Sequence, residues 1–253
     1  MNLTKTSNPV FGKSFFNAET IMSGETMTVQ GTINKALVLF GLLLAGAYYT
    51  WNIFFSLESL ELAQSTIMPW MLGSAIIGFV LAIATSFMRK LSPFLAPIYA
   101  MVEGLFLGAI SAFFESMYPG IVVQAVGLTM ATFFMMLFLY KTQIIRVTKK
   151  FVMGVVAATM GIAVFYLIGF ILSLFGVQVG ILYGNSLISI GLSLVIVVIA
   201  ALNLVLDFAF IDHATQSGAP KYMEWYGAFG LMVTLVWLYI EILRLLSKIS
   251  GRD

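Results

Sequence analysis

Seven long runs of apolar residues, separated by short polar connections, dominate this sequence. The runs cover residues 36–56, 67–88, 94–114, 120–140, 151–175, 185–207 and 223–247. A helix needs about 20 residues to cross the hydrocarbon core of a bilayer, and each run is long enough. The runs are continuously apolar, whereas strands of a membrane barrel alternate polar and apolar residues. The sequence therefore predicts an all-α, polytopic membrane protein built as a bundle of seven transmembrane helices.

Composition supports a membrane environment and excludes several classes of function. Only 9% of the 253 residues are charged, against about a quarter in soluble domains, so a water-exposed surface could not be covered. The net charge of +2 and the lack of basic stretches interleaved with aromatics argue against nucleic acid. The chain has no cysteine and one histidine, which excludes disulfides, thiolate sites and His-rich metal sites. We expect no resident cofactor, and any bound metal would be a hard cation on oxygen ligands.

The distribution of Lys and Arg predicts an orientation. Basic residues occur in the N-terminal tail and in the connections after the second, fourth and sixth runs, while the other connections contain none. The positive-inside rule then places the N-terminus in the cytoplasm, with a polar tail (1–32) followed by the transmembrane domain (33–250). Seven crossings put the C-terminus outside, where Arg244, Lys248 and Arg252 lie. Either late charges are tolerated or the last helix crosses incompletely, and we favour complete crossing.

Small residues recur at helix-packing spacing in two of the runs. They are Gly104, Gly108 and Ala112 in the third run, and Gly154, Ala158 and Gly161 in the fifth. Such ridges allow close approach of helices in a membrane, and we interpret both as packing surfaces.

Three carboxylates lie at membrane depth and are functional candidates: Glu103, Asp207 and Glu241. An Asp, Lys or Arg at the centre of a spanning helix costs at least about 2.5–3.5 kcal/mol, so such residues are rare and are commonly functional. Each also has a structural alternative. Glu103 could be protonated and bonded to a neighbouring helix, and Asp207 could be solvated at the cytoplasmic end of its helix. Glu241 could pair locally with Arg244, three residues later.

A stripe of small and polar residues accompanies Asp207 on its helix. Helical spacing places these residues on its face, interrupted by Ile196: Ser189, Ser193, Ala200 and Asn203. Such a face suits a bundle interior or a hydrated path, so Asn203 and Glu103 are weaker candidates for a cation pathway.

A pair of buried carboxylates is suited to proton sensing. Two carboxylates that lie close together share a proton and titrate as a unit. The same oxygens can hold a hard cation such as Ca²⁺. Helical spacing alone does not show that Asp207 and Glu241 meet.

Four segments carry a resemblance to a known family. They are residues 87–90, residues 91–99 leading into 103–111, residues 206–208 and residues 238–246. Over residues 33–250 the chain resembles the transmembrane Bax-inhibitor-motif (Bax inhibitor-1-like) family, specifically a bacterial branch with an extended N-terminal tail.

The resemblance implies a fold and a function. Family members have seven helices with the last one central, and the better-described bacterial members are pH-sensitive calcium leak channels of the cytoplasmic membrane. Their sensor is an acidic pair from helices six and seven with a basic residue from the end of helix two. By motif position, the resemblance implies Asp207 and Glu241 as the pair, with transient Ca²⁺ binding there, and Arg89 as the basic partner. The expected partners are the lipid bilayer, calcium ions and protons.

The sequence departs from the family pattern in four ways. The acid of the seventh helix is usually Asp, and here it is Glu241. Phe208 and Ala209 replace polar residues after the acid of the sixth helix, and the connection between the two acids is longer than usual. Gly78 falls near the position of a carboxylate in the second helix, and we expect Glu103 to supply that charge from the third.

A second hypothesis is a membrane interaction protein that modulates a membrane protease or a stress-response partner. The polar tail, residues 1–32, would dock that partner, although such a tail could equally be disordered. We do not expect an enzyme. The spans offer no Ser–His pair, because His213 is predicted in a loop, and the Gly-Asp motif of intramembrane aspartyl proteases is absent. A retinal protein would need a mid-helix lysine, and the seventh run has only Lys248, at its end.

Overall fold

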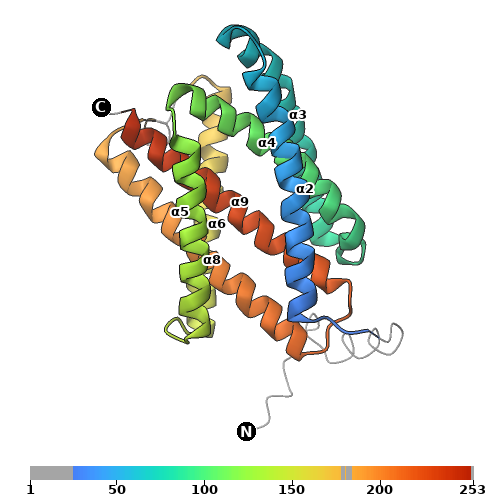
Figure 1. Cartoon of the computed structure of the whole chain (residues 1–253). Coiled ribbons are helices and arrows are strands. Elements are labelled where there is room, and N and C mark those ends of the chain that lie inside the picture. Colours follow the sequence, from blue (N-terminus) through green and yellow to red (C-terminus); the bar gives the residue numbers. More distant parts are fainter. Residues whose placement is uncertain (1–24, 178–179, 181–183, 252–253) are drawn as a thin grey trace.

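A computed structural model of the chain describes residues 25–177, 180 and 184–251. Its long helices are α2 (Val29–Phe55), α3 (Leu60–Phe87), α4 (Ser92–Met117), α5 (Ile121–Lys141), α6 (Lys149–Leu174), α8 (Leu187–Gln216) and α9 (Met223–Ser250) (Figure 1). A 3₁₀ turn, η2 (Arg89–Leu91), joins α3 to α4. All seven long helices are long and apolar enough to cross a membrane, which confirms the predicted fold class. Residues 1–24 of the predicted tail lie outside the described part.

Local signals in the sequence explain where several helices begin. A Ser or Thr precedes the first turn, and its side-chain oxygen accepts a hydrogen bond from a backbone N–H that has no partner within the helix. The capping residues are Thr28 for α2, Ser59 for α3, Thr148 for α6 and Ser186 for α8.

Helix α8 extends beyond its predicted end at residue 207, to Gln216. The extension holds because Phe208, Ile211 and Ala214 continue a buried stripe at three-residue spacing. Two expectations from the sequence are therefore wrong. Asp207 lies inside the helix and not at its end, and His213 lies in the helix and not in a loop.

Helix α9 is the central element of the bundle, as the resemblance implied. It packs against α2, α4, α5 and α8, and more of it is buried than of any other described helix (Figure 1). At its start, Met27 N–H donates to the Ala219 carbonyl (2.7 Å), beside the beginning of α2. At its end, Asn185 Nδ2 donates to the Gly251 carbonyl (2.9 Å), at the opposite end of the bundle. Helix α9 therefore runs from one end of the bundle to the other, and its complete crossing of a membrane stays a prediction.

Helices α2 and α4 pack backbone to backbone through glycine. A Cβ atom on Gly104 or Gly108 would overlap a backbone carbonyl of α2, and Thr50 Oγ1 donates across the interface to the Leu105 carbonyl (3.0 Å). The ridge of the third run is therefore a packing surface, as predicted. The ridge of the fifth run is not: no described atom outside the local helix lies within 4 Å of a Cβ built on Gly154 or Gly161. Helix α6 lies at the edge of the bundle, where its main contact is α8.

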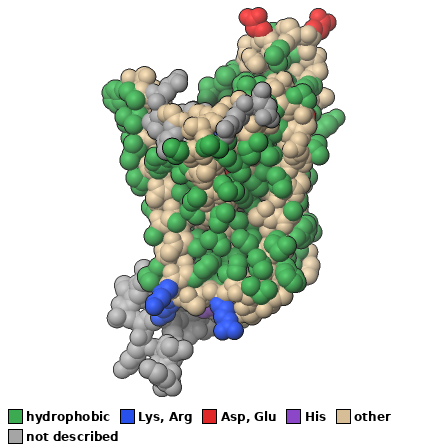
Figure 2. Space-filling view, turned by 90° about the vertical axis from the view of Figure 1, so that its left-hand side faces the viewer, with side chains coloured by type: hydrophobic (Ala, Val, Ile, Leu, Met, Phe, Trp, Pro, Cys, Tyr) green, Lys and Arg blue, Asp and Glu red, His purple; other side chains and the backbone are tan. Residues whose placement is uncertain are grey.

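The surface of the bundle separates charge by end. Figure 2 shows apolar side chains over the middle of one side, Asp and Glu at one end, and Lys and Arg at the other. The basic end is the one at which α2 begins. The positive-inside rule uses this asymmetry, and the cytoplasmic N-terminus stays a prediction.

The glycine contact yields a stability prediction. Replacing Gly108 by Leu should lower the free energy of unfolding by roughly 1–3 kcal/mol or more, because the new side chain meets the α2 backbone. Gly161→Leu is the matched control, and its effect should stay within about 0.5 kcal/mol because its Cβ position is open. Reversible unfolding in mixed micelles measures both variants. Equal effects would contradict the close approach of α2 and α4.

Candidate functional site

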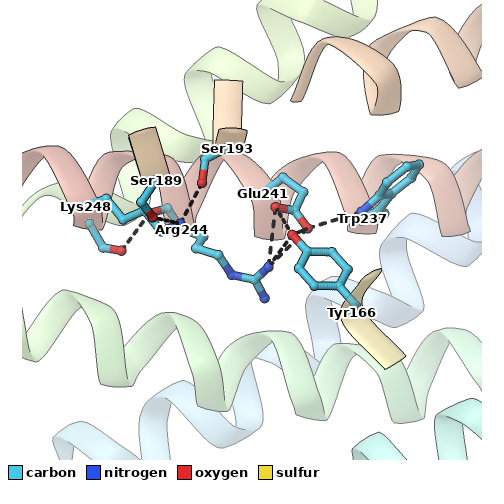
Figure 3. Close-up of polar contacts among 8 residues, drawn as sticks. Tyr166, Ser189, Ser193, Trp237, Glu241, Arg244 and Lys248 are labelled. Atoms are coloured by element: carbon cyan, nitrogen blue, oxygen red, sulfur yellow. Dashed lines mark hydrogen bonds and ion pairs between the residues drawn. The ribbon is translucent and has the colours of Figure 1, made fainter. Parts of the chain in front are cut away.

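A polar cluster surrounds Glu241 in the middle of α9. The side chain is 2% exposed, and its carboxylate accepts hydrogen bonds from Tyr166 Oη (2.9 and 3.0 Å) and Trp237 Nε1 (3.2 Å). Arg244 forms an ion pair with the same carboxylate at 3.3 Å and donates to Tyr166 Oη at 2.7 Å (Figure 3). The local pair with Arg244 that the sequence allowed is therefore present. It is not a solvated surface pair, because Tyr166 of α6 bridges both partners.

Lys248 extends this cluster toward the end of α9. It is 5% exposed, and its Nζ donates to Ser189 Oγ (2.9 Å) and Ser193 Oγ (2.8 Å) of α8 (Figure 3). Both serines belong to the polar stripe predicted on α8, which faces the bundle interior here. Sequence reasoning missed this role of Lys248. The signal was available, because two serines at i, i+4 spacing on an apolar helix can receive a cation.

The positive charges near the C-terminus thus have a structural explanation. Arg244 is held by Glu241 and Lys248 is enclosed by serines, so neither is a freely solvated cation at that end. Arg252 lies outside the described residues.

Asp207 occupies a different level of the bundle. Its Oδ2 atom is buried and has no hydrogen-bond partner among the described residues. The carboxyl group interacts with the side chain of Thr234, and its Oδ1 lies 3.9 Å from the Cβ position of Gly230. The α9 residues opposite Asp207 are therefore Gly230 and Thr234.

The structure does not bring Asp207 and Glu241 together. Thr234 and Glu241 are seven residues apart on α9, which corresponds to about 10 Å along the helix axis. No hydrogen bond or ion pair between the two carboxylates occurs in the part of the chain that is described. The cause is the helix hairpin, which turns near Ala219. Asp207 precedes this turn on α8, and the α9 residues beside it follow the turn at a similar distance along the chain.

Arg89 lies near the same end of α9 as Asp207. Its guanidinium carbon is 5.3 Å from the centre of the Tyr226 ring, one turn before Gly230. The Tyr226 ring in turn contacts Phe210 of α8, with ring centres 6.0 Å apart. Within the described ranges no ion pair joins Arg89 to Asp207 or Glu241. The contact of Arg89, the predicted basic partner, is with the Tyr226 ring instead.

Glu103 fills the space opposite Gly78. A Cβ atom on Gly78 would lie 2.9 Å from Glu103 Oε2, and Tyr99, one turn earlier on α4, also interacts with this carboxylate. Glu103 of α4 therefore places its carboxylate against Gly78 of α3. This is the position at which we expected it to replace an acid that α3 lacks. Asn203 lies elsewhere, because its Nδ2 donates to Thr159 Oγ1 of α6 (2.8 Å). The two weaker pathway candidates therefore do not share one site.

Glu224 is a buried acid that the sequence reasoning did not single out. Its carboxylate is fully buried in the first turn of α9 and accepts from the N–H (3.0 Å) and the hydroxyl (2.9 Å) of Thr28. Lys35 and Lys221 each form an ion pair with it at 3.4 Å. An acid in a first helical turn was the available signal. Its contacts tie the start of α2 to the start of α9, which is a structural role.

A shared calcium site between the two predicted acids is not assembled in this arrangement. Asp207 and Glu241 lie on different levels, and within the described ranges no three His, Asp or Glu side chains gather closely enough to hold a metal. Of the two predicted acids, Asp207 has a buried oxygen without a hydrogen-bond partner among the described residues, and Glu241 is already engaged by donors.

One comparison with known proteins identified a relationship. A family model described as Bax inhibitor 1 like matches residues 8–251. Searches of curated proteins and of solved structures returned no match.

The cluster around Glu241 yields a second prediction. Tyr166→Phe removes the hydroxyl that joins Glu241 to Arg244 and should lower the free energy of unfolding by about 1–3 kcal/mol. The matched control is Tyr48→Phe, because Tyr48 is 71% exposed and its replacement should be nearly neutral. Unfolding in mixed micelles compares the two. A Tyr166→Phe protein as stable as the control would mean that this contact does not stabilise α6 on α9.

Proposed function

This chain belongs to the Bax inhibitor 1 like family, and on that premise we propose that it is a proton-controlled cation leak of the membrane. The observation that carries the proposal is the buried Oδ2 of Asp207, which has no partner among the described residues. Native proteins leave few buried polar atoms unsatisfied, because each costs free energy. A proton, a water molecule or a passing cation would fill this acceptor.

The leak path follows one face of α9. Thr234, Glu241 and Lys248 are spaced by seven residues, so they lie nearly in line along the helix. Asp207 stands beside the first of them, and Ser189 with Ser193 surround the last. These contacts support a polar line between α8 and α9 through an otherwise apolar bundle.

The cluster around Glu241 closes this path. Arg244 and Lys248 are cations, and a cation entering beside them would be repelled. Arg244 is fixed by Glu241 and Tyr166, so the closed arrangement is held by a carboxylate that can itself take up a proton. Protonation of Glu241 would weaken its hold on Arg244 and on α6.

Calcium is the permeant ion that the sequence resemblance implies. Carboxylate oxygens are the ligands that Ca²⁺ prefers in proteins, and Asp207 presents one. In this proposal Asp207 and Glu241 act at two separate positions along the path, and Ca²⁺ binds each of them transiently. Arg89 lies near the position of Asp207. The compartment proposed is the bacterial cytoplasmic membrane, with the basic end and the N-terminus in the cytoplasm.

A flux measurement tests the role of Asp207. Calcium influx into proteoliposomes should change with pH for the wild type, by at most about tenfold per pH unit if one group titrates. Asp207→Asn has a similar shape but cannot ionise, so its flux should depend less steeply on pH than that of the wild type, and the remaining dependence belongs to Glu241. Glu58→Gln is the control, because Glu58 is an exposed acid in the α2–α3 connection, and it should follow the wild type. The proposal fails if Asp207→Asn and the wild type give the same flux at every pH.

A further inference from the structure

Two hollows lie between α2 and α5, and α9 contributes to the lining of both. Both helices pack on α9 but hardly contact each other, and Figure 1 shows them standing apart with α9 crossing behind. The hollows measure about 610 and 520 Å³ and share Phe40, Met130 and Leu235 in their linings. They therefore lie end to end, and each has the size of a ligand pocket, about 300–1,000 Å³.

The 520 Å³ hollow has the dimensions of a single acyl chain in one leaflet. On α2 it extends from Val29 to Phe40, which is about 16 Å of helix. One leaflet supplies half of the hydrocarbon core, or about 15 Å. The lining is almost entirely apolar, and its rim residues Leu37 and Phe134 are 66% and 62% exposed, so the hollow opens sideways to lipid.

The end of the bundle at which this hollow opens carries an excess of positive charge. Lys141 lines the hollow beside Asp212, which pairs with that lysine at 3.4 Å. At the same end of the bundle, the α5–α6 connection and the first turn of α6 carry three exposed cations: Arg146, Lys149 and Lys150. One acid against four bases leaves a basic patch where the headgroups of the same leaflet lie. Basic groups at the membrane end of helices attract anionic lipid headgroups.

We propose that the 520 Å³ hollow binds one anionic phospholipid, with an acyl chain between α2 and α5 and its phosphate at Lys141. The chain lies against Phe133, Leu137 and Phe208, and its tip reaches Met130. This site is separate from the polar line on α9 and independent of the leak. The basic residues at this end of the bundle distinguish it from ordinary contact with bulk lipid.

Native mass spectrometry from mixed micelles tests the site. The protein is equilibrated with equal amounts of phosphatidylglycerol and phosphatidylcholine of the same chain length. The wild type should retain one phosphatidylglycerol in about tenfold preference over phosphatidylcholine. Replacing Lys141, Lys149 and Lys150 together by Gln should remove this preference, whereas Lys90→Gln, on η2, should keep it.

A second pair of variants tests the chain pocket. Met130→Trp fills the inner end of the hollow and should lower retention of phosphatidylglycerol about tenfold. Met135→Trp is the matched control, because Met135 lies on the same helix, is 57% exposed and lines neither hollow. Should Met130→Trp not fold, Leu37→Trp on the rim replaces it. Equal retention of both lipids by the wild type, or equal retention by the Met130 and Met135 variants, would overturn the proposal.

Discussion

An ionisable group inside a bilayer must find its partners within the protein, and α9 is where this chain meets that requirement. Glu241 is satisfied by Tyr166, Trp237 and Arg244, and Lys248 by two serines of α8. Each partner comes from α9 itself or from a helix that surrounds it. A central position is therefore a physical necessity for this helix, because no lipid-facing helix could supply partners on all sides.

The surrounding helices are held in two different ways. Helix α2 is fixed to α4 by backbone contact at Gly104 and Gly108, which leaves no room for adjustment. Helix α6 buries little of its surface, and in the described part of the chain two of its side chains make polar contacts with the core. Thr159 bonds to Asn203, and Tyr166 bonds to Glu241 and Arg244. A change of charge at Glu241 would therefore act on α6 far more than on α2. The contact between α2 and α4 thus rests on close backbone packing, whereas the attachment of α6 rests in part on the ionisable groups Glu241 and Arg244.

The helices and the packing role of Gly108 could be predicted from the sequence, because apolar length and glycine spacing are local properties. The levels of Asp207 and Glu241 could not. They depend on where α8 ends and where the hairpin turns, and the buried stripe beyond residue 207 extends the helix by two and a half turns. Burial of Lys248 was equally hidden, because a lysine near a helix end is usually solvated. For Gly161 the prediction from spacing was wrong. Its spacing suited helix packing, but no described residue packs on that face of α6.

Separation of the two acids changes the way in which protons can act. At about 10 Å and an effective dielectric constant of about 20, two unit charges interact by roughly 1.7 kcal/mol, against about 4 kcal/mol at 4 Å. Asp207 and Glu241 therefore share no hydrogen-bonded proton, but an interaction of this size still lets the charge of one acid influence the other. Asp207 faces Thr234 and an unfilled acceptor site, whereas Glu241 neutralises Arg244. Helix α9 also links the two acids mechanically, because Thr234 beside Asp207 and Glu241 itself lie on that one helix, so the proposed action of a proton at either acid falls on the same element.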